Sequence, residues 1–215
     1  MHRVLVATSN QGKIRDLMGA AAAHGIQIAS LPNFVSLPVV VEDGPTFEAN
    51  ACKKAEHYSH YAEGELVIAD DSGLVVDALG GAPGVRSARY AADEHKGRET
   101  FSNSDDEANN ARLLRELHDV PGEFRNGRFI CVIAAARNGH TLATFHGQAE
   151  GVILHAPRGS NGFGYDPLFF FPQIEKTFAE LTAQEKARYS HRGAAFRLFL
   201  DWAGHRADLH PHDAP

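Results

Sequence analysis

The chain has 215 residues, 43% of them hydrophobic, which is typical of a globular protein with a sizeable core. It carries 21 Lys and Arg residues against 27 Asp and Glu residues, a formal net charge of −6. A sequence-independent DNA or RNA binder usually has a basic surface, so this charge argues against that class. It allows a small anionic ligand, because a few placed cations can focus a local positive field.

Cysteine usage and short apolar runs predict a cytoplasmic protein with no membrane partner. Cys52 and Cys131 stand far apart and form no CxxC pair, so we expect no disulfide framework. The first apolar run, residues 4–7, is too short for a signal peptide, and no run reaches the length of a membrane-spanning helix. The polar stretch at 205–215 is expected to form a flexible tail.

The first part of the chain predicts strands that alternate with helices. Apolar runs and periodicity predict, in chain order, a strand at 3–8, an Ala-rich helix at 13–24 closed by Gly25, short strands at 26–30 and 39–42, and a helix at 46–62. Two further strands flank Asp70-Asp71, and the polar residues 91–104 predict a mobile loop.

The second half predicts a hairpin followed by helices. Asn138-Gly139 is a strong turn signal between strands at 128–137 and 140–150. Thr182 and Glu185 have the capping-box spacing that opens a helix. The other expected elements are a helix at 105–119, a loop-rich stretch at 157–172 and a last helix at 193–203. This order predicts an α/β fold with a mixed sheet flanked by helices. An elongated sheet shared by two lobes fits the same order.

The acidic pair Asp70-Asp71 is the strongest chemical signal. It ends the apolar run 66–69, and a second apolar run follows at 74–76. Carboxylates are costly to bury unless they bind a cation or accept hydrogen bonds, and ligand sites in open α/β sheets lie beyond the carboxyl ends of strands. The pair therefore indicates metal-assisted chemistry on an anionic substrate. If one strand continues through both, the two side chains point to opposite faces. A turn rich in Asp, Ser and Gly is the alternative.

A candidate phosphate site lies between the first strand and the first helix, at Thr8, Ser9, Asn10, Gln11, Gly12 and Lys13. A helix N-terminus offers free N–H groups to a phosphate, and Lys13 adds a positive charge. The segment is not a Walker A loop, because Ala7 and Ile14 stand where that motif needs Gly and Ser or Thr. Considered alone, a capped helix with a surface lysine is the favoured interpretation.

Glu42-Asp43 forms a second acidic pair, just before the predicted helix at 46–62. Asn50 and Lys54 are four residues apart and share one face of that helix. The alternative interpretation is a solvated helix face.

Two aromatic or basic clusters occur later in the chain. Phe163 and Tyr165 lie in the Gly-rich stretch 159–167 and offer faces on which a base can stack, unless they pack under a flexible loop. Lys186 precedes His191-Arg192, which stand at a helix boundary. A basic helix end that favours the macrodipole is the alternative there.

Taken together and in this order, the motifs resemble the inosine triphosphate pyrophosphatase family, and within it the bacterial dITP/XTP pyrophosphatases. The resemblance spans residues 4 to about 200. The matching motifs are Thr8-x-Asn10-x-x-Lys13, Phe47-x-x-Asn50-Ala51-x-x-Lys54-Ala55, Ala69-Asp70-Asp71-Ser72-Gly73-Leu74, Gly80-Gly81-Ala82-Pro83-Gly84, Phe163-Gly164-Tyr165-Asp166-Pro167 and Ser190-His191-Arg192-Gly193.

The resemblance implies an active site in a central cleft between two lobes, a homodimer, and Mg²⁺-dependent hydrolysis of dITP, ITP and XTP to the monophosphate and pyrophosphate. Such an activity cleanses the nucleotide pool. It implies that residues 8–13 bind the triphosphate, that Asp71 is the general base, and that Glu42 and Asp71 bind Mg²⁺. Asp43 is the alternative ligand, since relatives often carry two glutamates before the glycine at position 44. Substrate contacts are implied for Ser72, Phe163, Gly164, Tyr165, Asp166, Lys186, His191 and Arg192, with support from Asp70, Asn50 and Lys54.

Other functions fit some of the same features. A Maf-like pyrophosphatase of modified nucleotides has a related architecture. A non-catalytic nucleotide sensor is disfavoured by the acidic pair, because a pure triphosphate binder gains nothing from an extra carboxylate base. A nucleic-acid-binding module is the weakest alternative, given the net charge of −6.

Overall fold

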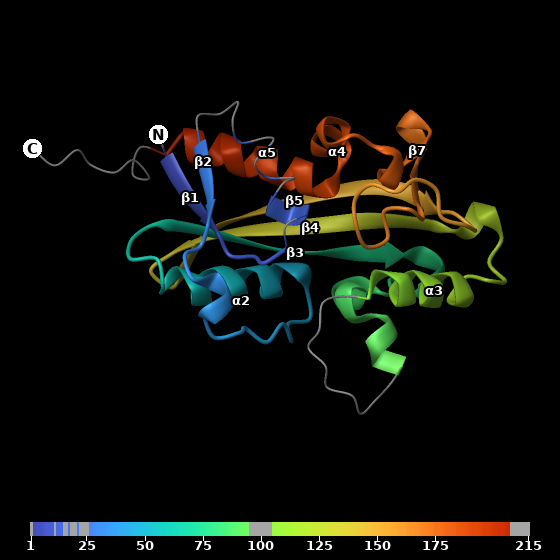
Figure 1. Cartoon of the computed structure of the whole chain (residues 1–215), viewed down its shortest axis with the longest axis horizontal. Helices are drawn as coiled ribbons and strands as arrows, with labels where there is room; N and C mark the ends of the chain where they lie inside the picture. The colour runs from blue at the N-terminus through green and yellow to red at the C-terminus, as the bar shows by residue number, and fades with distance from the viewer. Residues whose placement is uncertain are drawn as a thin grey trace, which may run out of the picture. The chain divides into compact units, whose positions relative to one another are not determined.

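The computed structural model describes residues 2–10, 12–14, 17, 21, 26–94 and 105–206. Within them, the strands form one mixed, open sheet in the order β2-β1-β3-β4-β5-β6-β7 (Figure 1). β1 pairs in parallel with β2 and β3, whereas β6 pairs antiparallel with β5 and β7, so the predicted mixed α/β class is confirmed. The strands are β1 His2–Val6, β2 Ile26–Ser30, β3 Leu66–Val76, β4 Asn126–Arg137, β5 His140–Ile153, β6 Phe169–Phe171 and β7 Lys176–Thr177.

The helices begin and end close to the predicted limits. The α-helices are α2 Phe47–Ser59, α3 Asp106–Glu116, α4 Ala183–Tyr189 and α5 His191–Gly204. The short 3-10 helices are η2 Phe34–Ser36, η3 Asp77–Leu79, η4 Gly84–Arg89, η5 Ala91–Glu94, η6 Gly122–Phe124, η7 Pro172–Ile174 and η8 Phe178–Glu180. No helix among the described residues is long and apolar enough to cross a membrane.

Internal contacts divide the chain into two compact units. Unit 1 comprises Met1–Asp71, Cys131–Gly147 and Ala187–Pro215, and unit 2 comprises Ser72–Ile130 and Gln148–Lys186. The prediction of a single domain of two lobes stays a prediction, as does the flexible tail, since residues 207–215 lie outside the described part.

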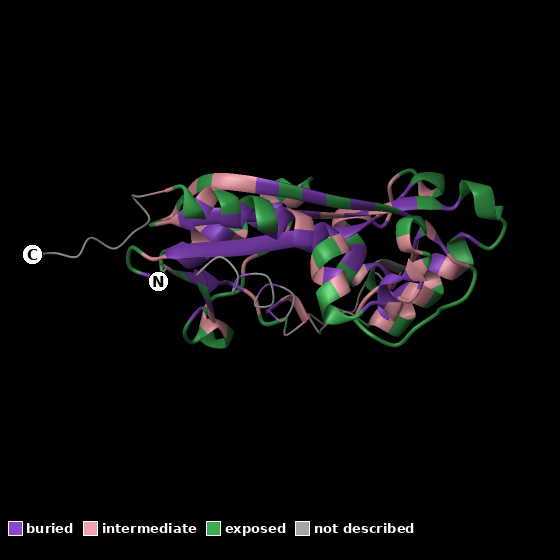
Figure 2. Ribbon diagram, turned by 90° about the horizontal axis from the view of Figure 1, so that it is seen from above, coloured by how far each residue is buried: buried purple, intermediate pink, exposed green. Residues whose placement is uncertain are grey.

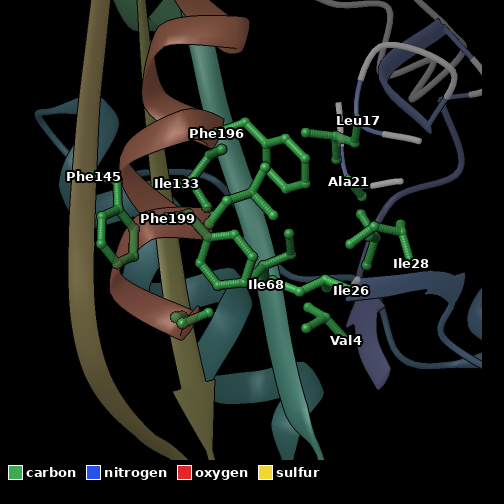
Figure 3. Packing of buried hydrophobic residues seen from close by; sticks show 14 of the residues in the cluster. Val4, Leu17, Ala21, Ile26, Ile28, Ile68, Ile133, Phe145, Phe196 and Phe199 are labelled. Atoms are coloured by element: carbon green, nitrogen blue, oxygen red, sulfur yellow. The ribbon is translucent and has the colours of Figure 1, made fainter. Parts of the chain in front are cut away.

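The core of unit 1 lies between its strands and α5. Phe196 and Phe199 of α5 pack toward Ile68 and Ile133 (Figure 3). The Phe145 ring meets that of Phe199 edge-on, with 5.6 Å between centroids. α5 thereby covers one face of these strands, and α2 lies against the other (Figure 1).

β3 is a single strand through the acidic pair, so the expectation of two strands flanking Asp70-Asp71 was wrong. β3 is buried along nearly its whole length, and buried residues are concentrated in the strands (Figure 2). Leu66, Val67, Ile68 and Ala69 before the pair and Leu74 and Val76 after it are apolar and buried. Burial on both faces is typical of a central strand. The apolar residues on either side of the acidic pair are buried in the sheet, so the backbone stays extended through Asp70 and Asp71.

Three other element predictions need correction or fall outside the described residues. Residues 39–42 form no strand, and Val39 and Val41 are exposed instead of paired in the sheet. Of the predicted loop 91–104, residues 91–94 form η5 and residues 95–104 lie outside the described part. Of the helix predicted at 13–24, the described residues 13, 14, 17 and 21 are helical, and Gly25 is not described.

The local signals in the second half are confirmed. Asn138 and Gly139 both have positive φ, of 52° and 81°, as the two-residue hairpin turn requires. The N–H of Thr182 donates to the Glu185 carboxylate at 2.8 Å, and the N–H of Glu185 donates to Thr182 Oγ1 at 3.2 Å. This reciprocal pair is the predicted capping box, and α4 begins directly after Thr182.

Unit 2 is held by aromatic rings and by a buried arginine. Phe129, Phe169 and Phe178 pack together, with centroid distances of 4.6 Å and 4.8 Å from Phe169 to the other two rings. Arg125 is 1% exposed. Its guanidinium donates to the carbonyl oxygens of Leu117 at 2.6 Å, Ile153 at 2.8 Å and Leu154 at 3.1 Å. It thereby ties the end of α3 to β5 and the residue that follows it.

Replacing Arg125 with Met should lower the free energy of unfolding by about 2–3 kcal/mol, because the substitution leaves buried carbonyls without their charged donor. Arg128→Met is the matched control. Arg128 lies in β4 and pairs with Asp77 at 2.9 Å on the surface, and the loss should stay below about 1 kcal/mol. Urea denaturation of both variants checks this, and equal losses would show that Arg125 has no special structural role.

Candidate active site

Asp70 and Asp71 are both buried in β3, at 7% and 8% exposure, and have different partners. Lys13 Nζ lies 2.9 Å from both Asp70 carboxylate oxygens, and Arg192 Nε lies 3.5 Å from Oδ2. Burial alone would raise the pKa of Asp70, but the charges of Lys13 and Arg192 outweigh it and hold the pKa well below its usual range. Asp70 is therefore a permanent anion between two cations.

Asp71 has the opposite character. Asn50 Nδ2 donates to Asp71 Oδ2 at 3.1 Å, and Lys54 Nζ lies 3.7 Å from Oδ1. Burial, the largest effect, raises the pKa of Asp71 above its ordinary value. The Lys54 ammonium opposes this rise, while the Glu42 carboxylate adds to it. Asp71 is thus the more basic of the two carboxylates. The alternating directions expected for a continuous strand account for the two separate sets of partners.

Glu42 and Asp43 also differ in surroundings. Glu42 Oε2 accepts from Lys54 Nζ at 2.7 Å, so Glu42 and Asp71 share one ammonium group. Asp43 pairs with Lys53 at 2.6 Å in an exposed ion pair. Of these two neighbouring acids, only Glu42 converges with Asp71 on a common cation.

Asn50 connects this group to the chain before α2. Its side chain is buried, donates to Asp71, and accepts from the N–H of Gly44 at 2.8 Å. A Cβ at position 44 would lie 2.7 Å from Asn50 Oδ1, so glycine permits the close approach. The alternative of a solvated helix face was wrong for Asn50.

The segment at residues 8–13 forms a capped helix start, as its composition predicts. Asn10 Oδ1 accepts from the N–H groups of Gly12 at 2.9 Å and Lys13 at 3.2 Å, and Thr8 Oγ1 accepts from Asn10 N–H at 3.2 Å. Ser9 is exposed, and Gln11 lies outside the described residues. Lys13 is no simple surface lysine, because its ammonium is bound to Asp70.

His191 and Arg192 are buried in the first turn of α5, which starts two residues earlier than predicted. Ser190 caps the helix by accepting from Gly193 N–H at 3.1 Å. A cation is disfavoured at a helix N-terminus, so the interpretation of a basic helix end was wrong. Asp70 supplies the compensating charge for Arg192.

In unit 2, Asp166 organises the Gly-rich loop. Its Oδ2 accepts from Lys186 Nζ at 2.6 Å and from Phe163 N–H at 2.9 Å. Lys186 Nζ lies 4.8 Å from the centre of the Phe163 ring. Tyr165 is buried and its hydroxyl donates to the Ser87 carbonyl at 2.8 Å, so its ring supports the loop. Ser72, the first residue of unit 2, is half-buried in β3.

A cavity of about 460 Å³ lies between the Gly-rich loop and α3. Asp106 and Asn110 line it and form hydrogen bonds to Gly164. Neither residue was predicted from the sequence. Asp106 has the pattern of an ordinary acidic residue in the first turn of a helix, and no local signal links α3 to a loop more than 50 residues away.

Comparisons with known proteins agree over nearly the whole chain. Residues 4–202 match the model of the Ham1 family. The dITP/XTP pyrophosphatase of Geobacter sulfurreducens is 48% identical over 204 residues, which cover 95% of this chain and 98% of that protein. The dITP/XTP pyrophosphatase of Acidobacterium capsulatum is also 48% identical, over 91% of this chain and 95% of that protein. The structure of a HAM1 protein from Coxiella burnetii matches with a TM-score of 0.80 and 35% sequence identity. The match covers 96% of this chain and 100% of that one. The chain belongs to the Ham1 family.

Proposed function

We propose that this protein hydrolyses non-standard purine nucleoside triphosphates, such as dITP and XTP, to the nucleoside monophosphate and pyrophosphate. The single observation that carries the proposal is the buried Asp71, whose pKa is raised and which shares Lys54 with Glu42. Curated relatives named dITP/XTP pyrophosphatase support the substrate class. Membership of the Ham1 family argues against the Maf-like alternative.

Asp71 is the proposed general base. It accepts a proton from a water molecule whose oxygen attacks the α-phosphorus, and the bond to the leaving pyrophosphate breaks. A carboxylate whose pKa is raised by burial is a better proton acceptor than an exposed aspartate, as general-base catalysis requires. Lys54 and Asn50 hold the carboxylate in place.

The residues present fit a magnesium ion bound partly through the substrate. Glu42 and Asp71 converge on one ammonium group, so their oxygens can serve a common cation. No group of three or more His, Cys, Asp or Glu side chains arranged for a metal occurs among the described residues. Mg²⁺ is commonly bound by one or two carboxylates, substrate phosphates and waters, which matches this pair. When bound, Mg²⁺ would neutralise phosphate charge.

Substrate contacts are proposed separately for each unit. In unit 1, the segment at residues 8–13 is proposed to bind the triphosphate, and Lys13 of this segment and Lys54 provide positive charge. His191 and Arg192 are proposed to direct donors at the 6-oxo group of the purine, since an amino group there would leave such donors unpaired. In unit 2, the Phe163 ring is proposed as the stacking surface for the base.

Product analysis tests the reaction. Purified protein with Mg²⁺ and dITP, ITP or XTP should release one pyrophosphate per monophosphate, resolved by ion-exchange chromatography. A diphosphate product together with inorganic phosphate would contradict attack at the α-phosphorus. Binding of these nucleotides without any turnover would instead favour the sensor alternative.

The homodimer and the two-lobed domain are further proposals from the family resemblance, and the cytoplasmic location is a further proposal from cysteine usage and the short apolar runs. Sedimentation equilibrium across a range of protein concentrations checks the first of them. A single species with the monomer mass of 23.4 kDa at every concentration would contradict the dimer.

A further inference from the structure

The backbone around Phe163 would be very flexible if it were left to its own sequence. Gly162 and Gly164 flank Phe163 and have positive φ, of 79° and 61°, in the region that glycine reaches most easily. A cavity of about 460 Å³ lies beside this loop, and Phe163 itself lines it. The Phe163 residue therefore borders open space on that side, while Lys186 Nζ lies 4.8 Å from the centre of its ring.

Three side chains, one from the loop and two from α3, bind the peptide groups of Phe163 and Gly164. Asp166 Oδ2 accepts from the N–H of Phe163 at 2.9 Å. Asp106 Oδ2 accepts from the N–H of Gly164 at 2.7 Å, and Asn110 Nδ2 donates to the carbonyl oxygen of Gly164 at 3.0 Å. Both polar groups of the residue that follows Phe163 are thus bound by α3. The bond to the Asp106 carboxylate is charge-assisted, which makes it stronger than a neutral hydrogen bond.

α3 is a firm support for these two contacts. Asp106 and Asn110 are four residues apart and share one face of the helix. The helix is capped by Asp105, which accepts from Ala108 N–H at 2.9 Å. Asn109 is buried on another face and accepts from Ala91 N–H at 2.7 Å. The contacts to Gly164 therefore come from an element that is anchored independently of the loop.

We infer that Asp106 and Asn110 are positioning residues for base recognition, which act through Gly164 to orient the Phe163 ring and do not touch the nucleotide. This inference rests on the proposed function, because it assumes that the base stacks on Phe163. It predicts that losing either contact lets the glycine-flanked loop sample other conformations. Affinity for the base then falls, while affinity for the triphosphate moiety is retained.

The test compares variants by KM and kcat for ITP and by the Kd for inorganic triphosphate. Phe163→Ala provides the reference for loss of stacking, expected to raise the KM for ITP by about tenfold to a hundredfold. Asp106→Ala and Asn110→Ala should each raise that KM by about tenfold, with kcat and the Kd for inorganic triphosphate within about twofold of wild type. Asp106→Asn keeps an acceptor oxygen for Gly164 N–H and should restore most of the wild-type KM.

Glu107→Ala is the matched control. Glu107 is the next residue of α3 and lines the same cavity, but among the described residues it forms no hydrogen bond to Gly164. Its KM for ITP should match wild type. An Asp106→Ala value that equals the Glu107→Ala value would overturn the inference.

A double-mutant cycle separates positioning from a general structural role. If Asp106 acts through the Phe163 ring, then Asp106→Ala should add no further increase in KM to the Phe163→Ala variant. Additive increases, or parallel losses of ITP and triphosphate affinity, would overturn the inference. Should Asp106→Ala fail to fold, Asn110→Ala in the same cycle decides the question. Wild-type protein that releases no pyrophosphate from ITP would contradict the proposed function instead.

Discussion

Replacing Asp71 with Asn should reduce kcat for ITP by about 10²- to 10⁴-fold, the range for loss of a general base, while nucleotide binding persists. The amide is similar in size to the carboxylate, but it cannot accept the proton from water. Burial and Glu42 raise the pKa of Asp71, which suits it for proton transfer, whereas the charges of Lys13 and Arg192 outweigh burial at Asp70 and hold its pKa below the ordinary value. Single-turnover kinetics and calorimetry with ITP measure the two quantities separately. Full activity in Asp71→Asn would remove this residue from the mechanism.

Two further variants resolve which acid assists Asp71. Glu42→Gln should raise the Mg²⁺ concentration that gives half-maximal rate, because the metal loses one of its proposed carboxylate ligands. Asp43→Asn should leave that concentration unchanged, because Asp43 lies in the chain before α2 and forms an exposed ion pair with Lys53 of that helix. The reverse result would assign the ligand to Asp43 and would show that sharing Lys54 is not diagnostic of metal binding.

Replacing Asp70 with Asn should lower the free energy of unfolding by about 3–5 kcal/mol, the cost of removing one partner from a buried ion pair. Arg192 is 2% exposed, so the substitution leaves its charge buried without the anion that faces it. Lys13 loses the same partner. Chemical denaturation measures the change. Asp43→Asn is the control, because it breaks an exposed pair, and its unfolding midpoint should barely move.

The same ion pair predicts a pH dependence. Because the pKa of Asp70 is held below its ordinary value, its contribution to stability is present above the pKa of an unfolded aspartate, about 3.9, and is lost as the pH falls below it. The free energy of unfolding of wild-type protein should therefore approach that of Asp70→Asn as the pH is lowered from about 4. Denaturant unfolding of both proteins at a series of pH values measures this difference. An advantage that stays constant down to pH 2 would contradict the pairing.

Local rules in the sequence determined much of this fold. The Asn138-Gly139 hairpin, the capping box of Thr182 and Glu185, and the shared face of Asn50 and Lys54 depend on residues at most four apart, where backbone geometry alone sets the contact. The alternation of strands and helices likewise predicted the mixed α/β sheet. Ordered motifs spread along the chain were enough to indicate the family.

Tertiary structure alone decided how the two aspartates differ. Asp70 and Asp71 are adjacent and chemically identical. Lys13 and Arg192, 57 and 122 residues from Asp70, hold it as an anion, while Glu42 and Lys54 lie beside Asp71. Local rules also did not predict that residues 39–42 lie outside the sheet, with Val39 and Val41 exposed, or that α3 contacts Gly164. The physical reason is that propensity, periodicity and capping act between near neighbours, whereas burial and charge pairing depend on which distant segments the fold brings together.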